Sequence, residues 1–547
     1  MSLMGVNFWP FHIVNDMKKE IYNNMEIEMF GDAPDNLYMS LVNTVKLFPD
    51  KQALVEDNQI ITYKEFKELV DVFASNLFTM YSVKKGDRVA LLLVNSIDFC
   101  VAFYAIAKLG AISVPLSTKA KSTELSYFLK DSGAKVLILN EQWWENIKDI
   151  ISFTKIKHFI ITGDNKNNIN AKKIELLYNK KGSFDKNVRL PQIHDPVAIM
   201  YTSGTTGVPK GALLSHFNIL HGVISYKRIF DLSSEDSTVI AIPIFHITGL
   251  AALLCLFVHV GGTIYLQPYF NAKKVLKTVQ EKKITFLHGS PTVFILLLEQ
   301  SQNFAALESL KKAACGSANM PPEVLFKIKR WLPKTAFHTV YGLTETSSPA
   351  TIFPTDVYGS NKMGSSGVPI PGVEIKIIDE EGMECPCNSV GELLIRGSVV
   401  LEKYWNSNQK ATEDGWFKTG DLAKFDNDGY IYIVDRKKDM INRGGEKIYS
   451  FEVENILYTH PAVKEVAVIG VPDPVYGEVV KAVIVTNEGY SLTEEEVKEW
   501  VKQKLAKYKV PAYVQFINEM PRTNNGKISK KIIKQYYNDT FQKSCNY

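Results

Sequence analysis

A loop at residues 201–211, rich in glycine and hydroxyl side chains and containing one lysine, has the composition of a phosphate cradle. It reads Tyr-Thr-Ser-Gly-Thr-Thr-Gly-Val-Pro-Lys-Gly and follows an apolar, strand-like run at 196–200. Backbone amides in such a loop can point at phosphate oxygens, and the lysine adds positive charge. The loop is not the common P-loop, in which Gly-Lys precedes Ser or Thr at the start of a helix. A plain Gly- and Thr-rich hairpin is the alternative for this segment taken alone.

Four further segments with chemically active side chains follow this loop. They are Tyr341-Gly-Leu-Thr-Glu345, Phe417-Lys-Thr-Gly-Asp421, Asp435-Arg436 with Gly444-Gly445, and Pro521-Arg-Thr-Asn-Asn-Gly-Lys527. With the first loop, and in this order, they resemble the motifs of the adenylate-forming superfamily, which contains acyl-CoA synthetases, aryl-CoA ligases, luciferases and peptide-synthetase adenylation domains. The chain looks most like a fatty-acyl-CoA synthetase. The resemblance runs from about residue 35, so the first thirty or so residues lie outside it.

This resemblance implies an ATP-dependent acid-thiol ligase. Such an enzyme joins a carboxylic acid to AMP with release of pyrophosphate, and then transfers the acyl group to CoA. The adenylate is needed because a carboxylate is a poor electrophile, whereas its anhydride with AMP has a good leaving group. Since both reactants of the first step are anionic, fixed positive charge and oriented donors should dominate catalysis. The implied cofactors are ATP and Mg2+, with CoA as co-substrate.

The resemblance gives catalytic roles to residues in two of the motifs. Lys527 would bridge the carboxylate and the α-phosphate, although a surface lysine after a glycine turn is the plain alternative. Thr344 would donate to a phosphate oxygen, and Glu345 would hold Mg2+, which typically takes one or two carboxylates plus phosphates. Tyr341 and Gly342 would lie beside adenine. Without the family, the same Tyr-Gly-Leu-Thr-Glu turn is a helix N-cap.

Other motif residues are expected to bind the nucleotide. Asp421 would accept hydrogen bonds from the ribose hydroxyls and Arg436 would reinforce them, whereas a turn residue after glycine is the alternative for Asp421. The segment that passes beside adenine and the acyl pocket is Gly316, Ser317 and Ala318. The phosphate-loop residues expected at the nucleotide are Thr202, Ser203, Gly204, Thr205, Thr206 and Lys210.

The second half-reaction requires Lys527 to leave the site. In the family this occurs by rotation of a small C-terminal domain about a hinge residue, which corresponds to Lys438, and Gly445 then lies near the pantetheine tunnel. The charged run at 435–439 separates a region of short strands and turns from a second compact region of helices and strands. We therefore expect an N-terminal AMP-binding domain at 1–437 and a mobile C-terminal domain at 438–547 that carries the catalytic lysine.

The substrate is indicated by the segment Phe-His-Ile-Thr-Gly at 245–249. Amino-acid-activating relatives usually carry Asp at the position of His246, so a plain carboxylic acid is favoured, with His246 near its carboxylate. A satisfied core histidine is the alternative. Apolar residues at 250–256 and 290–297 would form a hydrophobic acyl pocket. A medium- or long-chain fatty acid is the first candidate, an aromatic acid of the cinnamate type is the second, and an acyl carrier protein is the alternative acceptor.

The elements that must position these residues alternate between strands and helices. Apolar runs at 88–94, 111–114, 135–139 and 158–162 are predicted strands, and the first two flank a helical stretch. Such alternation indicates βαβ units around a mostly parallel sheet. Short strands at 372–379, 391–397 and 428–434, separated by turns, predict a small β-rich subdomain after about residue 367. Strands at 466–471 and 479–486 with a helix at 493–505 predict an α+β C-terminal unit. The fold class is α/β.

Composition restricts the function classes further. With 547 residues the chain must form several compact units. A net charge of +4, from 63 basic and 59 acidic residues, lacks the basic excess of a nucleic-acid binder. Six scattered cysteines predict no disulfide framework. The apolar run at 239–258 is long enough to span a bilayer, but its proline, histidine and glycine predict a buried strand, turn and helix instead. No signal peptide is evident, and a cytoplasmic location is expected.

Overall fold

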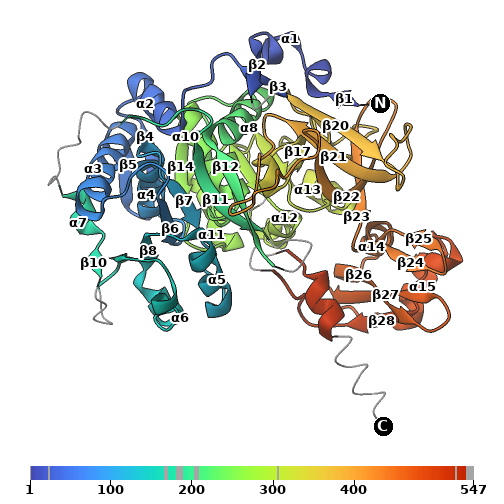
Figure 1. The fold of residues 1–547 in the computed structure, drawn as a ribbon. Coiled ribbons are helices and arrows are strands. Elements are labelled where there is room, and N and C mark those ends of the chain that lie inside the picture. Colours follow the sequence, from blue (N-terminus) through green and yellow to red (C-terminus); the bar gives the residue numbers. More distant parts are fainter. Residues whose placement is uncertain are drawn as a thin grey trace.

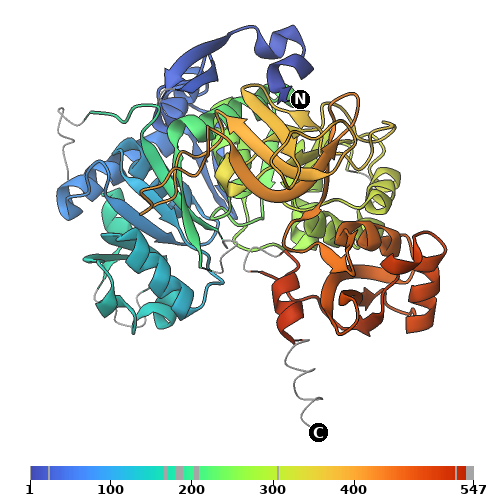
Figure 2. The ribbon, with the colours of Figure 1, turned by 45° about the vertical axis from the view of Figure 1, so that its right-hand side comes forward.

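The computed structural model describes residues 2–22, 25–164, 171–179, 189–202, 208–304, 307–523 and 527–536. It shows the predicted α/β architecture, with a large N-terminal part and a smaller C-terminal unit, which is drawn in red in Figure 1 and remains distinct in the turned view of Figure 2. Two large sheets form the centre of the N-terminal part, and a third, antiparallel sheet lies beside them, with the C-terminal unit below it in the view of Figure 1.

The first large sheet has the strand order β10-β9-β8-β6-β7-β11-β12 and is parallel except for the β11–β12 hairpin. Its strands are β6 (Arg88–Leu92), β7 (Ile112–Pro115), β8 (Val136–Asn140), β9 (His158–Thr162), β10 (Lys172–Lys173), β11 (Pro196–Thr202) and β12 (Lys210–Ser215). The four strands predicted from the sequence in this region are confirmed as β6 to β9, with ends that shift by at most two residues.

The second large sheet has the order β19-β18-β17-β16-β15-β13-β14-β4-β5, with parallel strands in its middle and antiparallel strands at both edges. Its strands are β4 (Gln52–Glu56), β5 (Gln59–Thr62), β13 (Ser237–Ile240), β14 (Thr263–Leu266), β15 (Phe286–Gly289), β16 (Lys312–Cys315), β17 (Ala336–Tyr341), β18 (Thr351–Ile352) and β19 (Val368–Pro369). The carboxyl ends of β16 and β17 lead into two of the predicted site segments.

Helices cover both faces of the two large sheets. The inner layer, which shares one apolar core with both sheets, contains α2 (Leu37–Leu47), α3 (Tyr63–Tyr81), α4 (Ile97–Lys108), α8 (His216–Ile229) and α10 (Leu256–Val260). The outer layers contain α5 (Ser122–Ser132) and α6 (Trp144–Ile147) on one side, and α11 (Ala272–Lys282), α12 (Pro291–Leu298) and α13 (Pro322–Trp331) on the other. A short helix, α7 (Glu175–Tyr178), packs against α3.

Burial on two faces explains why these strands are continuously apolar. In β6, Val89 and Leu91 belong to the central core, whereas Ala90 and Leu92 belong to the core beneath α5 and α6. A strand covered on both faces has no polar side, and its sequence therefore lacks the alternation of a half-exposed strand.

The apolar run at 239–258 is part of the central core. It forms the end of β13, a turn, the short helix α9 (Ile247–Gly249), a π-helix at Leu250–Cys255 and most of α10. The predicted strand, turn and helix are confirmed, and the helical part begins at Ile247. Residues 250–256 are at most 1% exposed and pack within this core. Within the described ranges, no helix combines the length and apolar character needed to cross a bilayer.

The β-rich subdomain is the antiparallel sheet β1-β20-β21-β22-β23. It contains β1 (Leu3–Met4), β20 (Val373–Ile378), β21 (Gly391–Gly397), β22 (Phe417–Phe425) and β23 (Ile431–Arg436). Three of these strands lie where the sequence predicts them. The first strand, in contrast, comes from the N-terminal segment, to which the sequence assigned no role.

That N-terminal segment packs across the subdomain and α8. Besides β1 it contains α1 (Phe11–Val14) and the hairpin β2 (Met17–Tyr22) and β3 (Met25–Phe30). Trp9 Nε1 donates to the Pro369 carbonyl at 2.8 Å, and Arg228 of α8 forms ion pairs with Asp16 at 2.6 Å and Asp32 at 2.7 Å. The segment is therefore an integral part of the N-terminal fold.

The C-terminal unit has its own sheet and core. It contains β24 (Ile441–Arg443), β25 (Glu446–Ile448), α14 (Ser450–Tyr458), β26 (Val463–Asp473), β27 (Gly477–Thr486), α15 (Glu494–Lys502), β28 (Tyr513–Phe516) and a helical segment at 530–536. Residues 437–440 connect β23 of the subdomain to β24 of this unit. The sequence predicts a domain boundary in the same connection.

Candidate active site

The loop that follows β17 holds Glu345 next to the start of the phosphate loop. Glu345 Oε1 accepts hydrogen bonds from Thr202 Oγ1 at 3.1 Å and from Tyr404 Oη at 3.0 Å. The Glu345 carbonyl accepts from the Leu401 amide at 2.9 Å. Both of these side-chain partners are hydroxyls that use one carboxylate oxygen, so, with respect to the described residues, lone pairs of the carboxylate stay open to a cation.

Gly342 allows this loop to fold back on itself. A Cβ atom at this position would lie 1.4 Å from the Ser348 carbonyl oxygen, so no other residue fits without a backbone shift. The turn is completed by Ser347 and Ser348, whose φ angles are +53° and +101°. Thr344 lies half-buried in the same turn.

The pairing of β22 with β23 places Asp421 opposite Arg436. Arg436 Nε lies 3.4 Å from Asp421 Oδ1, and Tyr341 Oη donates to Asp421 Oδ2 at 2.7 Å. Asp421 is 4% exposed. Burial raises its pKa, while Arg436 and the Tyr341 hydroxyl act in the opposite direction. The arrangement offers a buried carboxylate that can accept hydrogen bonds from sugar hydroxyls.

Lys527 extends from the C-terminal unit toward these residues. Its pKa falls to about 8, because burial disfavours the charged ammonium and Arg436 repels it. Asp421 and Glu345 attract the ammonium and act in the opposite direction. The predicted catalytic lysine and both predicted carboxylates therefore lie within electrostatic reach of one another.

Hydrogen bonds position the segment that carries Lys527. The Thr523 amide donates to the Lys527 carbonyl at 2.7 Å, and the Lys527 amide donates to Thr523 Oγ1 at 3.3 Å. Arg522 Nη1 donates across the two units to Thr292 Oγ1 at 3.2 Å, beside the start of α12.

His246 lies at the start of α9 and caps it, since its Nδ1 accepts from the Thr248 amide at 3.3 Å. Burial, with smaller contributions from the positive charge of Lys527 and from the ring of His288, lowers the pKa of His246 to about 3. The ring is neutral at pH 7 and lies near Lys527, so the structure brings this predicted residue to the same place.

The loop after β16 approaches α9. A Cβ atom on Gly316 would lie 2.9 Å from the Val340 carbonyl oxygen. Ser317 has a φ angle of +73°, and its Oγ lies 3.5 Å from Thr248 Oγ1. Ala318 is exposed. The loop thus connects the helix that follows His246 to the end of β17.

Three other predicted residues are exposed to solvent. Lys210 is exposed, with Nζ 5.3 Å from the centre of the Tyr404 ring. Lys438 is exposed in the connection between the two units and lowers the pKa of Asp421. Gly445 is exposed in the β24–β25 turn, and apart from its chain neighbours no heavy atom of the described residues lies within 4 Å of the place that a Cβ would take. Four predicted phosphate-loop residues lie outside the described ranges: Ser203, Gly204, Thr205 and Thr206.

Two family models match the chain in the same order as these features. The AMP-binding enzyme model matches residues 41–405, and the AMP-binding enzyme C-terminal domain model matches residues 452–527. The chain belongs to the AMP-binding enzyme family. The first range contains Glu345 and the second ends at Lys527.

Known AMP-binding enzymes similar to this one are acid-CoA ligases. A feruloyl-CoA synthase of an Amycolatopsis species is 34% identical over 502 residues, which cover 91% of this chain and 98% of the relative. The long-chain-fatty-acid-CoA ligase FadD13 of Mycobacterium tuberculosis is 32% identical over 515 residues, which cover 93% and 100%. The anthranilate CoA ligase AuaEII, solved with anthranoyl-AMP, has a TM-score of 0.84 at 27% identity, covering 92% and 97%. This AMP-binding enzyme is therefore an AMP-forming acid-CoA ligase, and the predicted superfamily and α/β fold are confirmed.

Some residues around the site of this acid-CoA ligase were not predicted. Tyr404, which holds Glu345, lies in a loop without a motif, and no spacing in the sequence indicates it. Its loop is positioned by α8, because Asn218 Nδ2 donates to the Ser398 carbonyl at 2.9 Å and the Val400 carbonyl at 3.1 Å. These contacts join residues about 180 positions apart and follow only from the tertiary fold.

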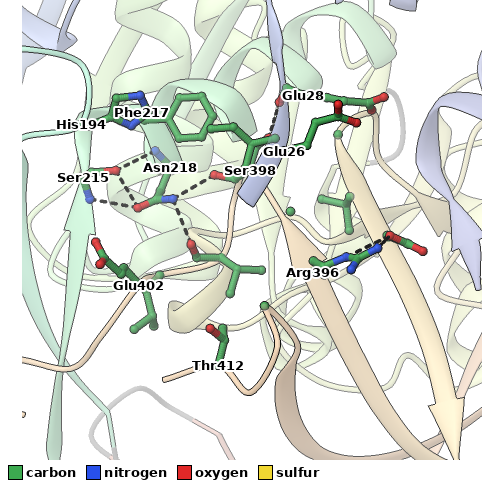
Figure 3. Close-up of a pocket in the computed structure, with 18 of the residues that line it drawn as sticks. Glu26, Glu28, His194, Ser215, Phe217, Asn218, Arg396, Ser398, Glu402 and Thr412 are labelled. Carbon is green, nitrogen blue, oxygen red and sulfur yellow. Dashed lines mark hydrogen bonds and ion pairs between the residues drawn. The ribbon is translucent and has the colours of Figure 1, made fainter. Parts of the chain in front are cut away.

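A cavity of about 640 Å3 lies elsewhere in this enzyme, between the β2–β3 hairpin and the subdomain sheet. Figure 3 shows Glu28 on one side of it and Asn218 bonded to Ser398 on the other. None of the predicted active-site residues that the structure describes lines this cavity. The cluster around Lys527 and the cavity are therefore separate features.

Proposed function

We propose that the cluster around Lys527 activates a carboxylic acid as acyl-AMP, with release of pyrophosphate, and that the acyl group then passes to CoA. The observation that carries this proposal is the position of Lys527, within electrostatic reach of Glu345 and Asp421 although it belongs to the other unit. In the first step a carboxylate oxygen attacks the α-phosphorus of ATP, and the bond to the bridging oxygen of pyrophosphate breaks.

Different residues of the cluster are proposed to bind different parts of the two substrates. Lys527 neutralises the carboxylate and the α-phosphate while they approach, which lowers the repulsion between two anions. Asp421, with Arg436 beside it, would bind the ribose hydroxyls, and Tyr341 would lie against adenine. Thr344 and the phosphate loop, with Thr202 and Lys210 at its ends, would donate to the phosphates.

Glu345 is the residue proposed to hold Mg2+. Its carboxylate is half-buried, and hydroxyl donors use only one of its oxygens. In the described part of the chain no three His, Cys, Asp or Glu side chains gather as a metal cluster. A single carboxylate still fits, because magnesium bound to a nucleotide takes most of its ligands from phosphates and water. When bound, Mg2+ would neutralise charge on the triphosphate.

The second step is proposed to use rotation of the C-terminal domain, residues 438–547, about Lys438. Lys438 is exposed in the short connection between the two sheets. Gly444 and Gly445 have φ angles of +61° and +95° and add no side chains of their own, which would permit a close backbone approach of pantetheine. The acceptor is CoA, with an acyl carrier protein as the alternative, and the expected location is the cytoplasm.

The class of carboxylic acid is proposed from the side chains that lie next to the loop containing Gly316. A medium- or long-chain fatty acid is the first candidate from the sequence. Of the two apolar runs expected to line its pocket, 250–256 is packed in the central core, whereas 290–297 lies in and just before α12, where Val293, Ile295 and Leu296 are half-buried. Tyr226 Oη lies 3.1 Å from Ser348 Oγ and 3.4 Å from His288 Nε2. His288 Cε1 would lie 3.7 Å from a Cβ atom on Gly316.

This polar group, Tyr226, His288 and Ser348, favours the second candidate, an aromatic acid with a hydroxyl substituent. His288 is 6% exposed, and its Nδ1 makes no hydrogen bond of standard geometry to a described group, although the Gly289 backbone acts to raise the pKa of the ring. Burial lowers its pKa to about 3, so the neutral ring offers one donor and one acceptor but no charge. A phenolic hydroxyl matches this group better than an alkyl chain or a second carboxylate does.

The proposal is tested by ATP-dependent pyrophosphate release with alkanoic acids of graded length and with hydroxycinnamic acids, each with and without CoA or a carrier protein. Lys527→Ala should lose most adenylation but keep thioester formation from a supplied acyl-adenylate. Equal loss in both half-reactions would contradict the two roles of the C-terminal domain. Tyr226→Phe should weaken turnover of hydroxylated acids only, and a uniform effect on all acids would remove the argument for the aromatic substrate.

A further inference from the structure

Asp435, the residue before Arg436, is a buried charge at the junction of the two units. It is 0% exposed and belongs to β23 of the subdomain. Its carboxylate faces the C-terminal unit, where it accepts hydrogen bonds from the Ser450 amide and from Ser450 Oγ, the latter at 3.0 Å. Ser450 is the first residue of α14 and is also 0% exposed.

Lys530 supplies positive charge to this contact. Its ammonium donates to Ser450 Oγ and to Glu454 Oε1, which lies 2.7 Å away, and the side chains of Lys530 and Glu454 are each 12% exposed. Glu454 also accepts from the Val468 amide at 2.8 Å. Burial raises the pKa of Asp435, and the Lys530 ammonium acts in the opposite direction. Each charge in the network is therefore hydrogen-bonded.

The network crosses the connection at 437–440. Asp435 lies on the N-terminal side of it, and Ser450, Glu454 and Lys530 lie on the C-terminal side. Other ion pairs between the two sides are exposed, such as Lys464–Glu299 at 2.9 Å and Lys447–Glu380 at 2.7 Å. Exposed pairs contribute little because water screens them, whereas a buried carboxylate that loses its donors must be rehydrated.

We propose that Asp435, Ser450, Lys530 and Glu454 form a latch that holds the C-terminal unit in the orientation in which Lys527 reaches the active site. The proposal rests on the proposed function, since it assumes that the unit rotates between the half-reactions. Lys530 follows Lys527 by three residues, so anchoring Lys530 positions the catalytic lysine. Rotation about Lys438 would move Ser450 away from Asp435, and the latch must open before the thioester is made.

These four residues are thus positioning residues, and their loss should affect the half-reactions unequally. Asp435→Asn keeps the shape of the side chain and removes the charge opposite Lys530. Lys530→Met keeps an unbranched chain and removes the ammonium. Each variant should slow adenylation by about tenfold, the typical effect of losing a hydrogen bond to a charged group. Thioester formation from a supplied acyl-adenylate and CoA should stay unchanged or become faster.

The experiment uses the full-length chain and measures the two half-reactions separately in single turnovers. Pyrophosphate release without CoA reports adenylation, and acyl-CoA formation from the supplied adenylate reports the second step. Lys531→Met is the matched control, because Lys531 is an exposed neighbour of Lys530, and it should change neither rate. Ser450→Ala, which removes the hydroxyl but keeps the amide donor to Asp435, should have a smaller effect in the same direction.

Two results would overturn the latch: equal loss of both half-reactions in Asp435→Asn and Lys530→Met, or no change in either. Thermal unfolding identifies variants that fail to fold, and Ser450→Ala then provides the milder test. Failure of the proposed function is a different outcome, because the unmodified enzyme would then form no adenylate with any acid.

Discussion

The depressed pKa of Lys527 predicts an unusual dependence of adenylation on pH. Lys527 must be an ammonium ion to neutralise the two reacting anions. Its pKa of about 8 in the free enzyme arises from burial and from Arg436. As pH rises through 8 the ammonium is lost, so kcat/KM for ATP, which reports the free enzyme, should fall.

The expected size of the fall follows from the titration of one proton. With a pKa of about 8, roughly 91% of Lys527 is charged at pH 7 and roughly 9% at pH 9, so kcat/KM should fall about tenfold. A lysine at its ordinary value of 10.5 would lose only about 3% of its charge by pH 9. Bound triphosphate attracts the ammonium, so the fall in kcat should occur at higher pH.

The measurement is the initial rate of pyrophosphate release at low ATP between pH 6.5 and 9.5, with activity checked after return to pH 7.5. Lys527→Arg is the control, because a guanidinium stays protonated over this range. Its lower activity should show no fall above pH 8. A flat profile in the unmodified enzyme, or the same fall in Lys527→Arg, would refute the assignment of this titration to Lys527.

Three further changes give separate predictions. Glu345→Gln should raise the Mg2+ concentration needed for half-maximal pyrophosphate release, since it removes the metal's carboxylate charge, and an unaltered requirement would exclude this role. Asp421→Asn should raise KM for ATP by about 10- to 100-fold through weaker hydrogen bonds to ribose. Kinetics with ATP as the varied substrate measure this KM, and an unchanged value would contradict the role of Asp421. Tyr63→Phe should lower the free energy of unfolding by about 1–3 kcal/mol, because Tyr63 Oη donates to the buried carbonyls of Phe257 at 2.9 Å and Gly262 at 2.6 Å. Urea denaturation checks this value, and an unshifted midpoint contradicts it.

Local sequence was sufficient to predict elements whose ends are marked by turns. The strands β9 (His158–Thr162) and β21 (Gly391–Gly397) have the predicted bounds, because apolar runs end there at polar or glycine residues. The site segments could be placed as well, since each motif follows or contains a strand end. Gly342 shows why such motifs are informative, because only glycine fits against the Ser348 carbonyl.

Contacts between distant segments could not be predicted in the same way. Tyr404 reaches Glu345 across 59 positions, and Lys530 reaches Ser450 across 80. Such pairs depend on how sheets and units pack, and neither residue type nor spacing specifies them. The acyl pocket prediction had the same weakness, because an apolar helix can line a cavity or fill a core, and residues 250–256 fill the core.

The two-residue strand β1 has a consequence for how the enzyme behaves in concentrated solution. Leu3 and Met4 pair with Ile375 and Glu374 of β20, which is otherwise the outermost strand of the subdomain sheet. An uncovered outer strand offers free amides and carbonyls that can pair with a second chain and start aggregation. Shortening the N-terminal segment, or fusing a bulky tag to it, should therefore promote self-association while the residues of the active site stay intact.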